Sequence, residues 1–177
     1  MQITEIGNDE RHAFLDLLLL GDEQPEMVEK YIDKGRMFVL YGDACARPAG
    51  EAVVIKLHDG AFEIKNIAVD PCFQKRGYGS ALIRHIQDLC SREGDCVLFA
   101  GTGDSPSTLG FYRKCGFEYS HTVKDFFTEN YDHPIYEDGV LLADMIYLKK
   151  SVPASWRQKA ECGACAAAKN RYAETSE

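Results

Sequence analysis

The chain has 177 residues, of which 45% are hydrophobic and 27% are charged, and its formal net charge at pH 7 is −8. This length and composition are those of one globular domain with at most a short appendage, and they exclude wholesale disorder. No apolar run approaches the ~20 residues that cross a bilayer, and an acidic chain is a poor generic partner for nucleic acid or for anionic membranes.

Hydrophobic periodicity and turn residues predict helices and strands up to about residue 150. In chain order we expect a strand at 2–6, a helix from the N-cap Asp9 to Gly21, a helix at 24–34, strands at 36–42, 50–57 and 61–69, a helix at 80–92, a strand at 96–100, a helix at 105–115, and strands at 117–123 and 141–148. Asp59-Gly60 indicates a type I′ turn between the two strands that flank it. This order predicts an α/β fold in which helices flank a mixed sheet.

The composition changes after Lys150. Residues 151–177 are rich in Ala, Cys and Lys, and we expect an appendage that forms a partly ordered helix interrupted at Gly163. A single C-x-x-C, Cys162 to Cys165, is a weak signal for a metal or a disulfide. The seven cysteines stand in apolar contexts and the first residues lack the features of a signal peptide, so we expect reduced thiols in a cytoplasmic protein.

Charge is unevenly distributed along the chain. Acids exceed bases in residues 1–35 and 117–144, whereas residues 63–116 have no acidic excess. This pattern favours an anionic cofactor at the centre of the chain and a cation near its flanks. The alternative is that both acidic stretches are solvated faces.

The loop at 74–80 has the composition of an anion-binding site. It reads Gln-Lys-Arg-Gly-Tyr-Gly-Ser and stands between an expected strand and an amphipathic helix. Its glycines allow a sharp turn and a close approach to a ligand, and the first N–H groups of a helix have no internal partners. The loop is not a Walker A motif, and Leu82 stands where a dinucleotide-binding motif has its third glycine. A simple tight turn is the alternative.

Two further motifs give this loop a context. Residues 66–71 read Asn-Ile-Ala-Val-Asp-Pro, and residues 110–117 read Gly-Phe-Tyr-Arg-Lys-Cys-Gly-Phe. Together with Gln74-x-x-Gly77-x-Gly79 they resemble the motifs of the GNAT superfamily of N-acetyltransferases, over residues 1 to about 148. The resemblance implies the GNAT fold, a central and mostly antiparallel sheet flanked by helices, for a domain at 1–150. It also implies an acyltransferase of the EC 2.3.1 class, with acetyl-CoA as cosubstrate and no metal.

The resemblance assigns a cofactor site. Backbone groups of Ile67, Ala68 and Val69 would pair with the pantetheine arm like an added strand, and the loop amides would hold the pyrophosphate. The loop residues assigned in this way are Gln74, Lys75, Arg76, Gly77, Tyr78, Gly79 and Ser80. Segments at 125–127 (Asp-Phe-Phe) and 134–137 (Pro-Ile-Tyr-Glu) match one bacterial branch of the superfamily. Many of its members carry Asn where this chain has Asp104, so we carry no cofactor contact over to that position.

Acetyl transfer to an amine needs a neutral nucleophile, a stabilised oxyanion and a proton for the departing thiolate. An alkyl amine of pKa ~10.4 is only about one part in a thousand neutral at pH 7, so a base or a desolvating site is required. By resemblance, Glu63 matches the catalytic Glu of the histone-acetyltransferase branch, Tyr112 matches the tyrosine that protonates the thiolate, and the N–H of Val69 matches the oxyanion donor. The alternatives are an exposed strand carboxylate beside Lys65 and a core tyrosine.

The sequence leaves two functions open. The first is direct acetyl transfer from acetyl-CoA to a primary amine of an unidentified, cationic acceptor, which is a small molecule or a protein lysine. The second is a non-catalytic acyl-CoA-binding or sensing module. Intact Glu63 and Tyr112 favour the first. The histidines form no metal-ligand spacing; we expect no nucleic-acid or membrane partner, and a homodimer stays open.

Overall fold

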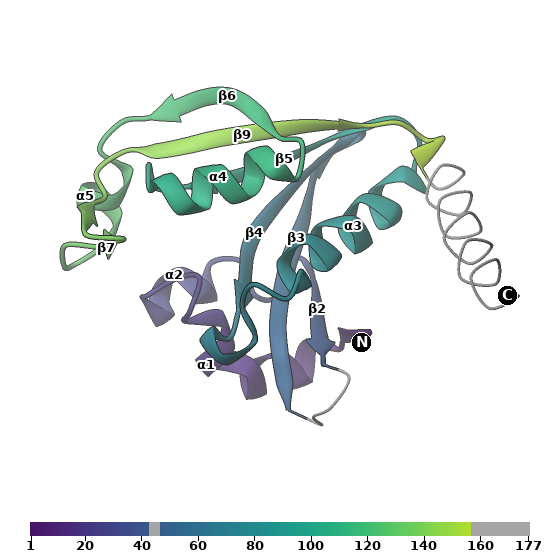
Figure 1. The fold of residues 1–177 in the computed structure, drawn as a ribbon, viewed down its shortest axis with the longest axis horizontal. Coiled ribbons are helices and arrows are strands. Elements are labelled where there is room, and N and C mark those ends of the chain that lie inside the picture. The colour runs from purple at the N-terminus through teal and green to yellow at the C-terminus, as the bar shows by residue number, and fades with distance from the viewer. Residues whose placement is uncertain (43–46, 157–177) are drawn as a thin grey trace, which may run out of the picture.

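The computed structural model describes residues 1–42 and 47–156, and Figure 1 shows its elements. In chain order they are β1 (Gln2–Ile6), the 3-10 helix η1 (Asn8–Phe14), α1 (Leu15–Leu18), α2 (Pro25–Glu29), β2 (Arg36–Tyr41), β3 (Pro48–His58), β4 (Ala61–Val69), the 3-10 turn η2 (Pro71–Phe73), α3 (Tyr78–Ser91), β5 (Cys96–Thr102), α4 (Pro106–Lys114), β6 (Glu118–Val123), α5 (Phe126–Asn130), β7 (Tyr136–Glu137), β8 (Val140–Leu141) and β9 (Met145–Val152). The helix expected around Gly163, with Cys162 and Cys165, lies outside the described residues.

Seven strands form one twisted sheet in the order β1-β2-β3-β4-β5-β9-β6, and β7 and β8 form a separate hairpin. Neighbours in the large sheet pair antiparallel except β4 and β5, which are parallel. The expected mixed and mostly antiparallel sheet is therefore confirmed.

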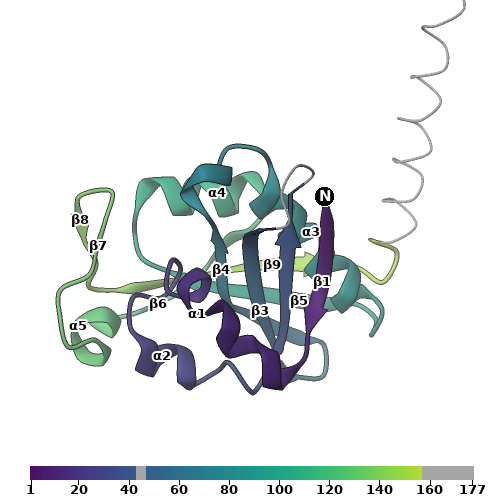
Figure 2. The ribbon, with the colours of Figure 1, turned by 90° about the horizontal axis from the view of Figure 1, so that it is seen from below.

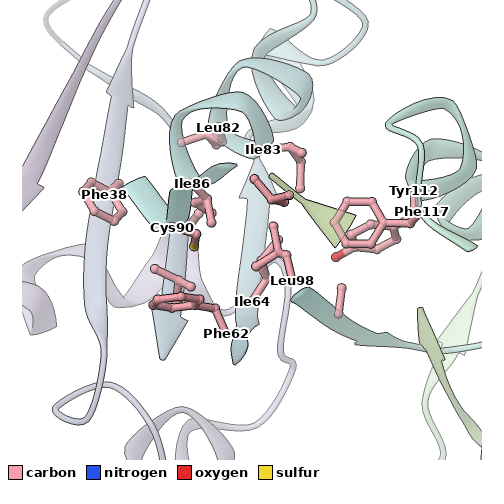
Figure 3. Close-up of a cluster of buried hydrophobic side chains, with 14 of the residues drawn as sticks. Phe38, Phe62, Ile64, Leu82, Ile83, Ile86, Cys90, Leu98, Tyr112 and Phe117 are labelled. Carbon is pink, nitrogen blue, oxygen red and sulfur yellow. The ribbon is translucent and has the colours of Figure 1, made fainter. Parts of the chain in front are cut away.

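Helices cover both faces of this sheet (Figures 1 and 2). The apolar stripe of α3 packs on one face, where Leu82, Ile83 and Ile86 meet strand residues such as Phe62 and Leu98; Figure 3 shows this cluster, which also includes Tyr112 of α4. On the opposite face a second cluster joins α1 and α2 to β2 and β3; its most buried members are Leu18, Val28, Ile32, Met37, Val39 and Val53. Among the described residues no helix is long and apolar enough to span a membrane.

Strands β4 and β5 separate part of the way along their length. Their parallel pairing ends at Ile64 and Ala100, although β4 continues to Val69 and β5 to Thr102. Figure 1 shows the two strands leaning apart, with α4 beside the opening. The final residues of β4 are thus paired with β3 alone, which leaves one edge of the strand open to a ligand.

The first two predicted helices are shorter than their apolar periodicity suggests. Residues Asn8–Phe14 form a 3-10 helix whose N-cap is Gly7, so the predicted cap at Asp9 is wrong. Helix α2 ends at Glu29 because the bonds that follow it reach back three residues, as from the N–H of Lys30 to the carbonyl of Met27 (3.2 Å). Such i→i−3 bonds form 3-10 turns, which are frequent at the ends of α-helices.

The type I′ turn predicted at Asp59-Gly60 is absent, because Gly60 has a positive φ and Asp59 does not. The hairpin itself is present between β3 and β4. An Asp-Gly pair does adopt the left-handed region at both positions between β7 and β8, where Asp138 has φ 52° and Gly139 has φ 77°. The same dipeptide signal therefore applies to the later hairpin.

The last strand differs from its prediction at both ends. Residues 141–148 were expected to form one strand, but β8 ends at Leu141 and β9 runs from Met145 to Val152. Val152 is 1% exposed, and Trp156 packs against the main core and against the ammonium of Lys150. Residues up to Trp156 therefore contribute to the same core as the preceding strands.

Candidate active site

The 74–80 loop and the start of α3 form a curved backbone segment. Gly77 caps α3 with φ 82°, and Lys75 also has a positive φ of 61°. Alternating left-handed residues turn successive backbone N–H groups toward one side and create a concave anion-binding surface. The side chain of Gln74 anchors the loop by donating to the carbonyl of Val69 (3.2 Å).

A cavity of about 570 Å³ lies between this loop, the end of β4 and α4. We name it the α3–α4 cavity. Its walls include all of the predicted cofactor residues except Arg76, and four further residues of α4 besides Tyr112; the walls are Ile67, Ala68, Val69, Gln74, Lys75, Gly77, Tyr78, Gly79, Ser80, Ser107, Thr108, Phe111, Tyr112 and Lys114. Arg76 instead donates to the carbonyl of Cys72 (3.2 Å) and lies over the ring of Phe73.

Ser107, Thr108, Phe111 and Lys114 of α4 were missed by the sequence analysis, although helical spacing from Tyr112 could have found most of them. Thr108, Phe111 and Tyr112 recur at intervals of three and four and so share one face of the helix with Ser107 on its edge. Lys75 and Lys114 contribute two cationic groups to the cavity walls. The cavity therefore combines a concave backbone, positive charge and apolar rings, which suits an extended anionic ligand.

A second cavity, of about 580 Å³, opens on the side of the sheet that carries α1 and α2. We name it the α1–α5 cavity, because the loop between α1 and α2 forms one wall and the segment from α5 to β7 forms another. Its charged residues are three acids and three lysines: Asp22, Glu23, Glu137, Lys30, Lys34 and Lys65. Acids and bases are therefore equal in number in the cavity walls, although acids exceed bases in the sequence as a whole.

The two cavities share three residues. Ile67 at the end of β4 and Thr108 and Tyr112 of α4 line both of them. They stand where β4 and β5 have separated, so two ligands that approached from opposite sides of the sheet would meet there.

Tyr112 is held rigidly at this meeting point. Its side chain is 4% exposed and packs against the rings of Phe111 and Phe117, with centroid distances of 5.2 and 5.3 Å; Figure 3 shows Tyr112 beside Phe117. Burial raises the pKa of Tyr112, and the nearby Cys115 and Glu137 act in the same direction. The hydroxyl therefore keeps its proton at neutral pH and is able to donate it.

Glu63 lies beside the α1–α5 cavity rather than in its wall. A β-bulge at Lys65 shifts the register, so that Ile64 faces Val54 but Asn66 faces Val53. The extra residue places Glu63 and Ile67 on opposite faces of β4. Glu63 lines neither cavity: its Oε1 accepts hydrogen bonds from Lys65 Nζ (2.9 Å) and from the hydroxyl of Tyr147 (3.0 Å).

A hydrogen-bond network crosses the α1–α5 cavity. Asn66 donates through Nδ2 to the hydroxyl of Tyr31 (2.8 Å), and Tyr31 donates to Oδ2 of Asp22 (3.4 Å). The hydroxyl of Tyr131, which follows α5, donates to Oδ1 of Asp22 (2.8 Å). Burial raises the pKa of Asp22 against the lowering effect of these hydrogen bonds. No periodic pattern in the sequence points to Asp22, because the network joins residues that are 109 positions apart.

Glu51 is a buried carboxyl next to the end of β4. It faces Ala68 across the β3–β4 pairing, is 0% exposed, and neither oxygen forms a hydrogen bond with a described residue. Burial raises the pKa of Glu51 well above its usual range, while the neighbouring amide of Ala68 acts in the opposite direction. The buried site therefore favours the neutral form of this carboxyl group.

Within residues 1–42 and 47–156, no three His, Cys, Asp or Glu side chains are grouped so that they could hold a metal ion. The cysteines described there, Cys72, Cys90, Cys96 and Cys115, are free thiols. His121 stacks on Tyr147, with 4.7 Å between ring centroids, and His133 contacts Asp132 and Glu23. Neither histidine lines either cavity.

Comparisons with known proteins identify the class of protein to which this fold belongs. Residues 33–119 match the family model for the acetyltransferase (GNAT) domain. The uncharacterized N-acetyltransferase YvbK of Bacillus subtilis is 34% identical over 146 residues, which cover 81% of this chain and 92% of YvbK.

Two solved structures have the same fold over most of their length. The IAA acetyltransferase of Bacillus cereus is 30% identical, with a TM-score of 0.77 and coverage of 85% of this chain and 98% of that one. A GNAT family acetyltransferase of Elizabethkingia anophelis, solved with acetyl-CoA bound, is 31% identical, with a TM-score of 0.75 and coverage of 84% and 95%. The chain belongs to the GNAT family, and the expected class of enzyme, an N-acetyltransferase, is confirmed.

Proposed function

We propose that the chain transfers an acetyl group directly from acetyl-CoA, bound in the α3–α4 cavity, to a primary amine that approaches through the α1–α5 cavity. The observation that carries this proposal is that the two cavities meet at Ile67, Thr108 and Tyr112. The acetyl-CoA bound in the Elizabethkingia relative supports the choice of cosubstrate.

The α3–α4 cavity suits each part of the cofactor. The open edge of β4 at Ile67 to Val69 can pair with the amides of the pantetheine arm. The loop backbone, Lys75 and Lys114 would hold the pyrophosphate. This arrangement directs the thioester toward Tyr112.

The proposed reaction moves one acetyl group and two protons. The amine nitrogen attacks the thioester carbon, a C–N bond forms, and the carbonyl oxygen becomes an oxyanion that the N–H of Val69 would stabilise. When the C–S bond breaks, the thiolate accepts the proton of the Tyr112 hydroxyl, and the tyrosinate would regain a proton from solvent, to which the base releases the proton that it took from the amine. The proton released by the amine goes to a base, for which we propose Glu63.

Glu63 would act on the acceptor without contacting it directly. It lies behind Lys65, whose side chain lines the α1–α5 cavity and contacts the carboxylate. The amine proton would therefore reach Glu63 across a bridging water beside Lys65 rather than by direct contact. Tyr147 fixes the carboxylate in place from the other side.

The acceptor would be a small amine or a protein lysine, and the free thiols fit a cytoplasmic setting. The alternative function is a non-catalytic module that binds acyl-CoA in the same cavity. Incubation of the full chain with acetyl-CoA and a panel of polyamines, amino acids and lysine peptides distinguishes the two. Our proposal predicts that one equivalent of free coenzyme A thiol forms for each acetylated product detected by mass spectrometry. Cofactor binding without acetylated product would support the module instead.

A further inference from the structure

Asp22 occupies a distinctive position in the α1–α5 cavity. Its carboxylate lines the cavity and is held from two sides, by Tyr31 within the first half of the chain and by Tyr131 from the second half. The neighbouring Gly21 packs directly against Asn66, and a Cβ built on it would lie 3.4 Å from the carbonyl oxygen of Ile67. Asp22 is thus close to the end of β4, where the two cavities meet.

Several aromatic residues line the same cavity as this carboxylate. Tyr31, Phe126, Phe127 and Tyr131 all line the α1–α5 cavity. The last three contact one another, with ring centroids 5.5 to 6.5 Å apart. Aromatic faces attract cations through their electron-rich surfaces, and the attraction grows when water is excluded. The Asp-Phe-Phe motif that opens α5 thereby supplies part of an apolar wall with affinity for a cation.

Asp22 has no cationic partner in the part of the chain that the structure describes. The groups that donate hydrogen bonds to it are neutral: the hydroxyls of Tyr31 and Tyr131 and the backbone amide of Gln24. It takes part in none of the ion pairs of the described residues. Lys65 is close enough to act on it, but the ammonium of Lys65 pairs with Glu63. A half-buried carboxylate without a cationic partner is stabilised when a ligand brings a positive charge to it.

We propose that Asp22, Tyr31, Tyr131 and the rings of Phe126 and Phe127 form a subsite for a second ammonium group of the acceptor, so that the substrates are diamines or larger polyamines. One amine reacts beside Tyr112 while the other is held at Asp22. This inference rests on the proposed function, because it assigns the far end of the amine acceptor. The three lysines of the same cavity would instead favour an acceptor whose far end is a carboxylate, and 5-aminopentanoate tests this alternative.

Three acceptors of matched length separate these choices. Cadaverine, n-pentylamine and 5-aminopentanoate each have a primary amine at one end of a five-carbon chain, and their far ends are an ammonium (the second amine of cadaverine), a methyl group and a carboxylate. With the full chain and saturating acetyl-CoA, we expect kcat/KM for cadaverine to exceed that for n-pentylamine roughly ten- to a hundredfold, as one charge-assisted contact allows. Asp22→Asn keeps an oxygen that can accept from Tyr131 but loses the charge, so it should reduce this ratio toward one. Asp33→Asn removes an equal charge from an exposed position outside the cavity and should leave the ratio as it is.

Equal kcat/KM values for cadaverine and n-pentylamine, or a preference for 5-aminopentanoate, would overturn the inference while leaving acetyl transfer in place. An equal loss for all three acceptors in Asp22→Asn would also overturn it, because Asp22 would then only hold the cavity together. If no amine is acetylated, the proposed function fails, and calorimetry of cadaverine and n-pentylamine with the coenzyme A complex still decides the subsite. Tighter binding of cadaverine that is lost in Asp22→Asn supports it, and equal binding overturns it.

Discussion

Tyr112 connects the core of the protein to its proposed chemistry. Its ring belongs to the cluster that joins α3, α4 and β5, while its edge lines both cavities. Burial serves both roles, because it fixes the ring and keeps the hydroxyl protonated. A flexible or exposed tyrosine would satisfy neither requirement.

Replacement of Tyr112 by Phe isolates the hydroxyl. The ring contacts with Phe111 and Phe117 remain, so the fold and the affinity for coenzyme A should change little. Loss of the proton donor should lower kcat by ~10²–10⁴-fold. Steady-state kinetics together with calorimetry of coenzyme A checks both parts. A variant with the parent kcat would mean that the thiolate leaves without help from this residue.

Glu63 is tested by the shape of the pH profile. If its carboxylate collects the amine proton, Glu63→Gln should flatten the acidic limb of kcat/KM and lower its plateau by ~10²–10⁴-fold. Tyr147→Phe is the matched control, since it removes one hydrogen bond to the carboxylate and keeps the carboxylate itself. The acidic limb should therefore persist in Tyr147→Phe. An unchanged profile in Glu63→Gln would assign the proton to another acid of the α1–α5 cavity.

The walls of the α3–α4 cavity, where we propose that the cofactor binds, were largely predictable because these residues are local in sequence. The loop carries its chemistry in consecutive residues, and nine of the ten predicted residues line the α3–α4 cavity while Arg76 turns to Phe73. Acceptor-side residues were not predictable in this way. Asp22 contacts Tyr131 only after the chain has folded. The position of Glu63 on the face of β4 opposite to Ile67 depends on a β-bulge, which no pattern of side chains predicts.

Two glycines of the 74–80 loop are required for different structural reasons. Gly77 needs its positive φ, and a Cβ there would meet nothing within 4 Å, so its constraint is the backbone conformation. A Cβ on Gly79 would lie 3.1 Å from two ring carbons of Phe111, so its constraint is the close approach of α3 to α4. From the sequence, both glycines are expected to let the backbone approach the cofactor. Only the structure distinguishes the backbone constraint at Gly77 from the packing constraint at Gly79.

Substitution of either glycine by Val should weaken coenzyme A binding for a different reason. Gly77→Val forces a β-branched residue into the left-handed region, at a cost of about 1–2 kcal/mol. Gly79→Val overpacks the contact with Phe111, at a cost of about 1–3 kcal/mol in stability. Gly110→Ala in the middle of α4 is the control, because its Cβ would meet nothing within 4 Å and should stabilise the helix by about 0.5–1 kcal/mol. Calorimetric affinities equal to the parent in both valine variants would show that the loop does not bind the cofactor.

The element order was predictable and the irregular connection near the C-terminus was not. Buried strands and the amphipathic α3 carry strong periodic signals, and β1 to β6 lie close to their predicted positions. Residues 124–144 instead fold through polar contacts with distant partners: Asp144 accepts from the backbone N–H of Asp125 (2.9 Å), and Asp138 accepts from Ser105 (2.8 Å). Short elements held by such contacts leave no repeating pattern in the sequence.

At the scale of the whole molecule, Glu51 couples stability to pH. As the pH rises, the unfolded chain loses the Glu51 proton at a lower pH than the native state does. Above pH ~4.5 the folded state therefore binds more protons than the unfolded state. The free energy of unfolding should therefore fall as pH rises, by up to about 1.4 kcal/mol per pH unit from this group. Glu51→Gln should remove this slope and raise stability at neutral pH.

Urea unfolding at several pH values between 5 and 8 measures this effect. The difference between the parent and Glu51→Gln isolates Glu51, because Asp22 and the other acids are common to both. Glu10→Gln, at an exposed position, should keep the slope of the parent. A parallel pH dependence in the parent and in Glu51→Gln would show that the buried carboxyl is not the source.

The central claim concerns the whole fold: the sheet opens between β4 and β5 so that cofactor and acceptor meet at Tyr112 from opposite faces. A crystal structure with a bisubstrate analogue, in which an acetyl bridge links the sulfur of coenzyme A to an alkylamine, tests this claim most directly. We predict the pyrophosphate at the 74–80 loop, the pantetheine along Ile67 to Val69, the sulfur within hydrogen-bond distance of the Tyr112 hydroxyl, and the alkylamine in the α1–α5 cavity. An analogue bound wholly on one side of the sheet, or with its sulfur remote from Tyr112, would contradict the account.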